Sequence, residues 1–178
     1  MKIRFELPAF LLSCCFSMAS SSSSSSTRSW KYDVFLSFRG PDTRKGITAQ
    51  IRDRLRRSGI ITFMDEPDLR VGDTISPTLI KAIKESRFAI VILSQNYASS
   101  TWCLEELREI CLSMEDNRIL PLFFEVDPTD VRHQKKSFEE AFSKHETSGR
   151  HESDKLNQWR AAISKVANIS GWNTNDYK

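Results

Sequence analysis

Hydrophobic positions along the chain form short apolar runs, and stretches with helical spacing lie between them. The most apolar run, residues 88–93, contains no polar side chain and predicts a fully buried strand. An earlier run, residues 32–38, is rich in aromatic and β-branched side chains and predicts another strand. Between the two, Ile47, Ile51 and Leu55 recur every four residues, which predicts an amphipathic helix.

The same patterns extend along the rest of the chain. Further strands are expected at residues 60–63 and 119–126, and further helices at residues 75–86, 103–114, 137–144 and 154–170. Strands and helices alternate at spacings of roughly 25 to 30 residues, which is typical of βαβ units and a parallel sheet. We therefore expect an α/β fold, a flavodoxin-like doubly wound parallel sheet with strand order 2-1-3-4-5.

The stretch after the most apolar strand carries the candidate chemistry. Residues 99–101 are Ser-Ser-Thr, which predict a loop and the N-cap of a helix. Glu106 lies one helical turn after Trp102, so the two side chains are neighbours on the helix surface. Glu105 points nearly opposite the apolar face of this helix and is expected to be solvated. An acid in an early helical turn also suits the helix dipole, which needs no function.

The expected topology brings five residues to one crevice. In this strand order the first and third strands are neighbours, and ligands bind where the strand order reverses. Arg39 and Gly40 follow the first strand, and Ser94, Trp102 and Glu106 follow the third. We expect these five side chains to lie around a single site.

Composition narrows the classes of function. The 178 residues are 28% charged and 39% hydrophobic, which fits one globular domain. The net charge of +3 is a weak argument for nucleic acid, which we do not expect as a partner. Cys103 and Cys111 lie about 12 Å apart along one expected helix, too far for a disulfide, so a reducing compartment is expected. No metal is expected, because His133, His145 and His151 lack metal-ligand spacing.

The first 29 residues are expected to precede the domain, which we place at residues 30–178. Residues 20–26 are all serine and indicate a disordered leader. Residues 1–19 combine basic residues, a short apolar run and small residues, as a secretory signal peptide does. We favour the alternative, an upstream extension with Met18 as the working start, because nothing downstream suits an oxidising compartment. The apolar run is too short to span a membrane, and no membrane partner is expected.

Several motifs in the chain occur in the order found in one known family. They are YDVFLSFRG at residues 32–40, DTR at 42–44, WCL at 102–104, EL at 106–107, VDP at 126–128 and WRAA at 159–162. From residue 30 to residue 172 the chain resembles the TIR (Toll/interleukin receptor) domain of plant immune receptors. The resemblance implies a flavodoxin-like fold and an enzyme that cleaves NAD+. It places the catalytic glutamate at Glu106, and it makes residues 65–73 a mobile loop that helps to close the site between protomers.

One carboxylate is enough for this chemistry. Nicotinamide is bound to ribose as a cation and leaves as a neutral molecule, so the site must stabilise positive charge on the ribose. Glu106 can do this electrostatically or can orient an attacking water. Trp102 can stack on the substrate and Arg39 can pair with a phosphate, and Gly40 and Ser94 complete the expected substrate-binding set. The ordinary alternatives are that Trp102 packs at the core and that Arg39 lies in a solvated loop. The resemblance implies NAD+ as the substrate, and no cofactor is expected.

Two departures from the family pattern affect the expected assembly and organisation. Ala49 and Gln50 occupy the positions of a Ser-His pair that usually builds a self-association face on the first helix. No Gly-rich phosphate loop or repeat follows, which predicts a protein with only a TIR domain. We expect an NAD+ glycohydrolase that signals in plant defence from the cytoplasm or nucleus and pairs with other TIR domains. The alternative is a non-enzymatic adaptor that only pairs with TIR domains.

Overall fold

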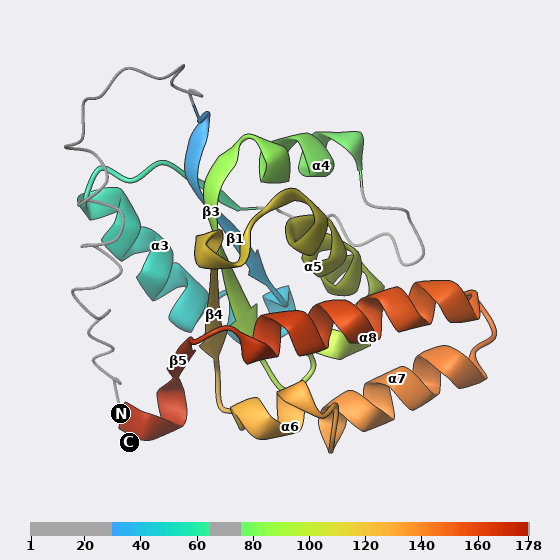
Figure 1. The fold of residues 1–178 in the computed structure, drawn as a ribbon. Coiled ribbons are helices and arrows are strands. Elements are labelled where there is room, and N and C mark those ends of the chain that lie inside the picture. Colours follow the sequence, from blue (N-terminus) through green and yellow to red (C-terminus); the bar gives the residue numbers. More distant parts are fainter. Residues whose placement is uncertain (1–29, 65–75, 178) are drawn as a thin grey trace.

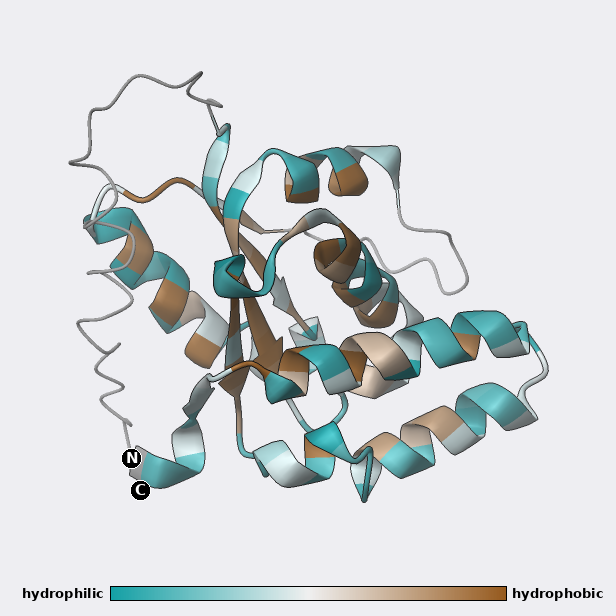
Figure 2. Cartoon of the chain, viewed as in Figure 1, coloured by the Kyte–Doolittle hydropathy of each residue, from teal (hydrophilic) through white to brown (hydrophobic). Residues whose placement is uncertain are grey.

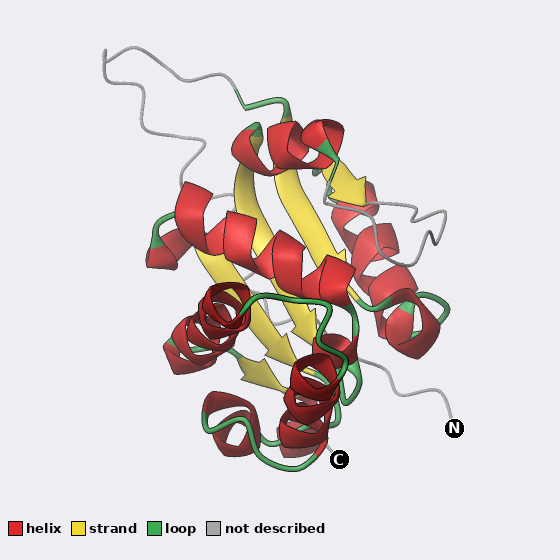
Figure 3. Ribbon diagram, turned by 90° about the vertical axis from the view of Figure 1, so that its right-hand side faces the viewer, coloured by secondary structure: helices red, strands yellow, loops and turns green. Residues whose placement is uncertain are grey.

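The fold is a five-stranded parallel sheet with helices on both faces (Figures 1 and 3). The computed structural model describes residues 30–64 and 76–177. The strand order is β2-β1-β3-β4-β5, which confirms the expected doubly wound topology. The strands are β1 (Tyr32–Phe38), β2 (Thr62–Met64), β3 (Ser86–Leu93), β4 (Ile119–Phe123) and β5 (Trp172–Asn173). The expected leader and the expected loop at residues 65–73 lie outside the described residues.

Helices cover the two faces of this sheet unequally. The α-helices are α2 (Gly40–Thr43), α3 (Ile47–Arg57), α4 (Pro77–Lys84), α5 (Thr101–Ser113), α6 (Pro128–Arg132), α7 (Ser137–Thr147) and α8 (Ser153–Asn168). Short 3-10 turns are η1 (Tyr97–Ser99), η2 (Asp116–Arg118) and η3 (Thr174–Tyr177). Helix α3 lies against one face, and α4, α5 and α8 lie against the other (Figure 1). In the described residues no helix is both long enough and apolar enough to cross a membrane.

The alternation of side chains along β1 decides what each face of the sheet contacts. Val34 and Leu36 are buried in the cluster that contains the inner face of α3, whereas Phe35 belongs to the cluster beneath α5. Figure 2 shows the apolar side of α3 turned toward the sheet. Ser37 follows the same alternation as Phe35, so its hydroxyl points to the α5 face, and the strand pairs it with Val91 of β3.

The structure differs from the sequence-based expectation mainly in short elements. The polar residues 39–44, which include Gly40 and Pro41, are typical of a loop, but Gly40–Thr43 form the single helical turn α2. The strand expected to continue to residue 126 ends at Phe123, shortly before Glu125 adopts a φ of 55°. Helix α6 and strand β5 had no counterpart in the expectation, because five and two residues are too short to show a hydrophobic period.

Candidate functional site

Helix α5 begins where the sequence predicts it, just beyond the carboxyl end of β3. The backbone of Ser100 is extended, and its hydroxyl accepts a hydrogen bond from the backbone N–H of Cys103 at 3.3 Å, as an N-cap residue does. The turn η1 lies directly before this cap and places Tyr97 beneath the helix, fully buried. The thiol of Cys103 contacts the carbonyl oxygen of Phe38 at 3.6 Å, so the first turn of α5 lies at the end of β1.

Glu106 lies at the end of a buried chain of hydroxyl groups. The residue is only 3% exposed, and the Ser37 hydroxyl donates to its Oε2 at 2.7 Å. The Ser37 hydroxyl also lies 2.8 Å from the phenolic oxygen of Tyr97. The Tyr97 hydroxyl in turn donates to the backbone carbonyl of Cys103 at 3.1 Å. Residues from β1, η1 and α5 therefore fix the carboxyl group of Glu106.

Tyr97 and Cys103, the two other side chains of this buried group that can lose a proton, stay neutral at physiological pH. Burial, with the nearby Cys103 and Glu106, raises the pKa of Tyr97 well above its ordinary value. Burial, with the charge of Glu106, raises the pKa of Cys103 to about 12. A thiol with this pKa is not an activated nucleophile.

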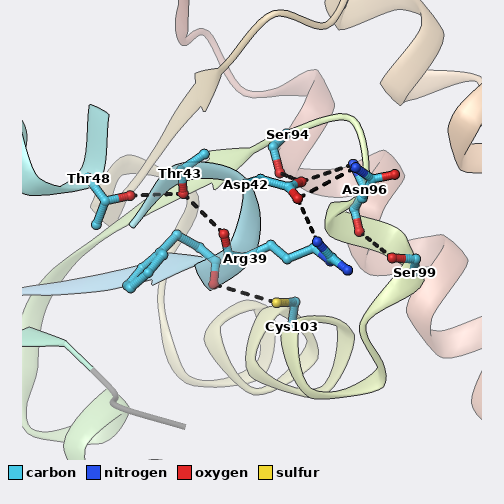
Figure 4. A network of polar contacts seen from close by, with 9 residues as sticks. Arg39, Asp42, Thr43, Thr48, Ser94, Asn96, Ser99 and Cys103 are labelled. Carbon is cyan, nitrogen blue, oxygen red and sulfur yellow. Dashed lines mark hydrogen bonds and ion pairs between the residues drawn. The ribbon is translucent and has the colours of Figure 1, made fainter. Parts of the chain in front are cut away.

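A second polar network lies nearer the surface and is centred on Asp42 (Figure 4). Its carboxylate pairs with the Arg39 guanidinium at 2.5 Å, accepts from the Ser94 hydroxyl at 2.6 Å and accepts from the Asn96 backbone N–H at 3.2 Å. Burial acts to raise the pKa of Asp42, but the Ser94 hydrogen bond and the Arg39 charge outweigh burial and hold this pKa below its ordinary value. The Asp42 carboxylate therefore joins the end of β1 to the end of β3.

The five residues expected around one crevice divide between these two networks. Arg39 and Ser94 are brought together, but through Asp42 rather than directly. Gly40 is the first residue of α2, beside Arg39. Trp102 and Glu106 both lie in α5, one turn apart, and the half-buried Trp102 packs against the hydrophobic core. The ends of β1 and β3 and the first turn of α5 lie together, whereas the single crevice and the catalytic and substrate-binding roles stay predictions.

The expectation for Glu105 is wrong. Its side chain was expected to be solvated, but the residue is only 6% exposed. Helix α8 packs alongside α5 and covers this side (Figure 1). Lys155 of α8 forms an ion pair with the Glu105 carboxylate, and Arg108 lies 3.6 Å from it. Glu105 therefore joins two helices and is a structural residue.

Ser37, Asp42 and Tyr97 lie in these networks but were not identified as site residues from the sequence. Asp42 lies in the DTR motif and Tyr97 lies in the turn after β3, but nothing local to them shows that they meet residues 52 and 60 positions away. Ser37 carried a usable signal, since a hydroxyl in an otherwise apolar buried strand needs a hydrogen-bond partner. That signal predicts a polar partner without identifying Glu106.

Comparison with known proteins gives a consistent family assignment. Residues 31–178 match the TIR domain family. The chain is 49% identical over 156 residues to the TMV resistance protein N of Nicotiana glutinosa, covering 86% of this chain and 13% of that protein. It is 46% identical over 160 residues to the disease resistance protein RPV1 of Vitis rotundifolia, covering 89% of this chain and 11% of that protein. The chain thus spans only a small part of the length of these relatives.

A solved structure has the same fold, and its sequence is about as similar to this chain as those of the relatives above. The TIR domains in the structure of the activated Roq1 resistosome, which directly recognises the pathogen effector XopQ, superpose with a TM-score of 0.72. The sequence identity is 49%, and the match covers 82% of this chain and 89% of that chain. The motifs, the sheet order and these matches all agree, and the chain belongs to the TIR domain family, with relatives among plant disease resistance proteins.

Proposed function

We propose that this TIR domain hydrolyses NAD+ at the nicotinamide–ribose bond, with Glu106 as the catalytic residue. The observation that carries the proposal is the placement of one buried carboxyl group at the strand-order switch between β1 and β3. The bond between ribose and nicotinamide breaks, and its electron pair leaves with nicotinamide, which becomes neutral. Water adds to the ribose carbon and releases a proton, so the products are nicotinamide, ADP-ribose and H+.

The surroundings of Glu106 suit a group that stabilises developing positive charge. A carboxylate acts more strongly on a nearby cation where water is excluded, and Glu106 is almost fully buried. The Ser37 hydrogen bond fixes the direction of the carboxyl group before substrate arrives. Because Glu106 is almost fully buried, turnover requires the side chains that cover it to move apart.

The proposed substrate-binding residues are already engaged with each other. Arg39 forms an ion pair with Asp42, and Ser94 donates to the same carboxylate. A substrate phosphate would therefore compete with Asp42 for the guanidinium group of Arg39. A β-carbon at Gly40 would lie 3.2 Å from the guanidinium of Arg44, so glycine at this position leaves room for that side chain. Trp102 would supply an aromatic surface at the edge of the site.

We further propose that the chain acts in plant immune signalling and assembles with other TIR domains. Its relatives are disease resistance proteins, and the similar TIR domains of Roq1 belong to a resistosome. A reducing compartment, the cytoplasm or nucleus, fits the two described cysteines. Both are free, and burial raises the pKa of Cys111 to about 11, as it does that of Cys103.

A non-enzymatic adaptor is the second candidate. The 3% exposure of Glu106 favours it, because a carboxyl group covered on all sides does not contact a substrate. In this alternative the chain of hydroxyl groups contributes only to stability, and the protein acts only through contacts of its exposed helices with other TIR domains.

NAD+ turnover by the purified full chain, followed as release of nicotinamide over a range of protein concentrations, distinguishes the two candidates. Glu106→Gln keeps the shape of the side chain and is expected to lower turnover at least about 100-fold. Glu140→Gln, at an exposed position of α7, is the matched control and is expected to leave turnover unchanged. Wild-type chain without turnover at any concentration, or with Glu106→Gln fully active, would overturn the proposal.

A further inference from the structure

The hydrogen-bond chain beside Glu106 has more contacts than hydroxyl hydrogens. Three contacts join the Glu106 carboxyl, the Ser37 hydroxyl, the Tyr97 hydroxyl and the Cys103 carbonyl. Ser37 and Tyr97 supply one hydrogen each, and a carbonyl supplies none. When Glu106 is ionised, Ser37 donates to it, and the single hydrogen of Tyr97 is shared between Ser37 at 2.8 Å and Cys103 at 3.1 Å.

One additional proton on Glu106 supplies the third hydrogen that the three contacts require. The carboxylic acid then donates to Ser37, Ser37 donates to Tyr97, and Tyr97 donates to the carbonyl oxygen of Cys103. Each of the three contacts contains one hydrogen, and all of them run in one direction. The heavy atoms can keep their places, because each distance suits a hydrogen bond of either direction.

We propose that Ser37 and Tyr97 are positioning residues for Glu106, and that their two hydroxyl groups reverse their hydrogen bonds when its carboxyl group gains or loses a proton. The two residues hold the carboxyl group in one place in both protonation states. They also set how readily it ionises, because the two states contain different numbers of hydrogen bonds. Only the catalytic consequence of this inference rests on the proposed function.

Among the residues that the structure describes, the titratable groups treated below do not take over this role. Burial raises the pKa of both Tyr97 and Cys103, so both keep their protons while Glu106 titrates. On the far side of Cys103, Arg39 and Asp42 are paired with each other. On α5 itself, Glu105 faces away from the chain of hydroxyl groups and toward its own cations, Arg108 and Lys155 of α8.

The proposal predicts different pKa shifts for two variants. Tyr97→Phe removes two hydrogen bonds from the neutral state of Glu106 and one from the ionised state, so the Glu106 pKa falls. Ser37→Ala removes two neutral hydrogen bonds from the neutral state and one bond to the carboxylate from the ionised state. A bond to a charged group is about twice as strong as a neutral one, so the two losses nearly balance and the Glu106 pKa shifts by less than in Tyr97→Phe. One hydrogen bond of difference corresponds to a shift of roughly half a unit to one unit.

The experiment follows the carboxyl group itself and does not require activity. The full chain is prepared with 13C-labelled glutamate side chains, and Glu106→Gln identifies the carboxyl signal of Glu106 during a pH titration by NMR. Tyr32→Phe and Ser86→Ala are the matched controls: Tyr32 is a second tyrosine next to the core, and Ser86 is a second buried serine, which donates to Ala82. Both controls are expected to leave the titration of Glu106 unchanged.

A downward shift in Tyr97→Phe with a smaller shift in Ser37→Ala supports the proposal. An unchanged titration in both variants, or an upward shift in Tyr97→Phe, overturns it. If Tyr97→Phe does not fold, Ser37→Ala decides, because removing a serine that only donates to the carboxylate raises the Glu106 pKa by about a unit or more, and such a rise contradicts the reversal. Ser37→Thr, which keeps the hydroxyl, is expected to retain the wild-type value.

Activity provides a separate readout that distinguishes this inference from the proposed function. Cleavage uses the ionised carboxyl group, so the acid limb of the turnover profile is expected to move to lower pH in Tyr97→Phe and to move less in Ser37→Ala. The NMR shifts without any NAD+ turnover would refute the proposed function and leave the positioning intact. Turnover that depends on Glu106 but not on either hydroxyl group would support the proposed function and refute the positioning role of Ser37 and Tyr97.

Discussion

Two adjacent glutamates in α5 show how strongly the surroundings decide the role of a single residue. Glu106 contacts neutral hydroxyl groups beneath the helix, whereas Glu105 contacts two cations on its outer side. Both are almost fully buried. The helical period of the sequence correctly separates their directions, but it contains no information on α8, which covers Glu105. The role of a polar residue is therefore less predictable from sequence than its direction.

The ion pairs of Glu105 are expected to contribute to stability. Glu105→Gln removes the carboxylate that pairs with Lys155 and Arg108. Arg108 keeps its ion pair with Glu109 at 2.7 Å, and both cations are about one-third exposed, so part of the loss is compensated. We expect the free energy of unfolding to fall by about 1–2 kcal/mol, between the values for exposed and buried pairs. Urea denaturation measures this change. Glu140→Gln serves as the exposed control, and equal stability of the two variants would show that the ion pairs contribute nothing.

Asp42 makes stability depend on pH in the acid range. Burial opposes its ionisation, but Ser94 and Arg39 hold the folded-state pKa below the ordinary value. The unfolded chain therefore takes up the proton first, so the stabilisation is complete above the ordinary Asp pKa of about 3.9 and is lost as the pH falls through the lower folded-state value.

Comparison of wild type with Asp42→Asn tests this dependence. The difference between their urea midpoints is expected to be constant from neutral pH down to about pH 5, and then to shrink as the pH falls further. A difference that stays constant down to the lowest pH at which both chains fold would contradict the assignment to the Asp42 charge.

Among the elements, length decides what the sequence predicts. The seven- and eight-residue strands β1 and β3 and the long helices α3, α5 and α8 each contain enough apolar positions to show a period. The single turn α2 and the two-residue strand β5 do not. The position of β5 depends on β4, a neighbour some fifty residues away in the chain, with which it pairs in parallel.

Close packing at Gly171 maintains the pairing of β5 with β4. A β-carbon at residue 171 would lie 2.4 Å from the backbone carbonyl oxygen of Pro121, so Gly171→Ala must push the two strands apart. We expect faster hydrogen exchange at the backbone amides of Trp172 and Asn173, measured by NMR. Gly59→Ala is the control, since Gly59 has a φ of 75° but no atom within 4 Å of its β-carbon position. It is expected to cost about 1 kcal/mol of stability without changing exchange in β5.

At the scale of the whole molecule, the order of the strands determines where the site lies. Because β1 and β3 are neighbours, residues that follow Phe38 and Leu93 meet at one edge of the sheet. This part of the site followed from alternating strands and helices alone. The pairing of Ser94 with Asp42 and the burial of Glu106 did not, because both depend on side-chain contacts between distant elements.

Helix α3 lies on the opposite face of the sheet from α5, which separates the proposed chemistry from a proposed contact surface (Figure 1). Its outer side borders a depression of about 300 Å³, to which Ala49 and Gln50 contribute. Ala49 is half-buried and Gln50 is exposed. These residues replace the Ser-His pair that the family resemblance implies for self-association. A contact through this helix would therefore change activity only by bringing protomers together.

We expect a mostly monomeric chain whose turnover per molecule rises with concentration. Alanine offers no side-chain hydrogen bond, and glutamine cannot carry the charge of a histidine, so the loss of such contacts weakens association by about 1–2 kcal/mol, or roughly 5- to 30-fold. Ala49→Ser with Gln50→His is expected to shift sedimentation velocity profiles toward dimer and to raise specific activity at a fixed concentration. Glu140→His, on the exposed side of α7, should do neither. Activity per molecule that is flat on dilution, together with a double variant that sediments like wild type, would exclude assembly through α3 even if Glu106 is catalytic.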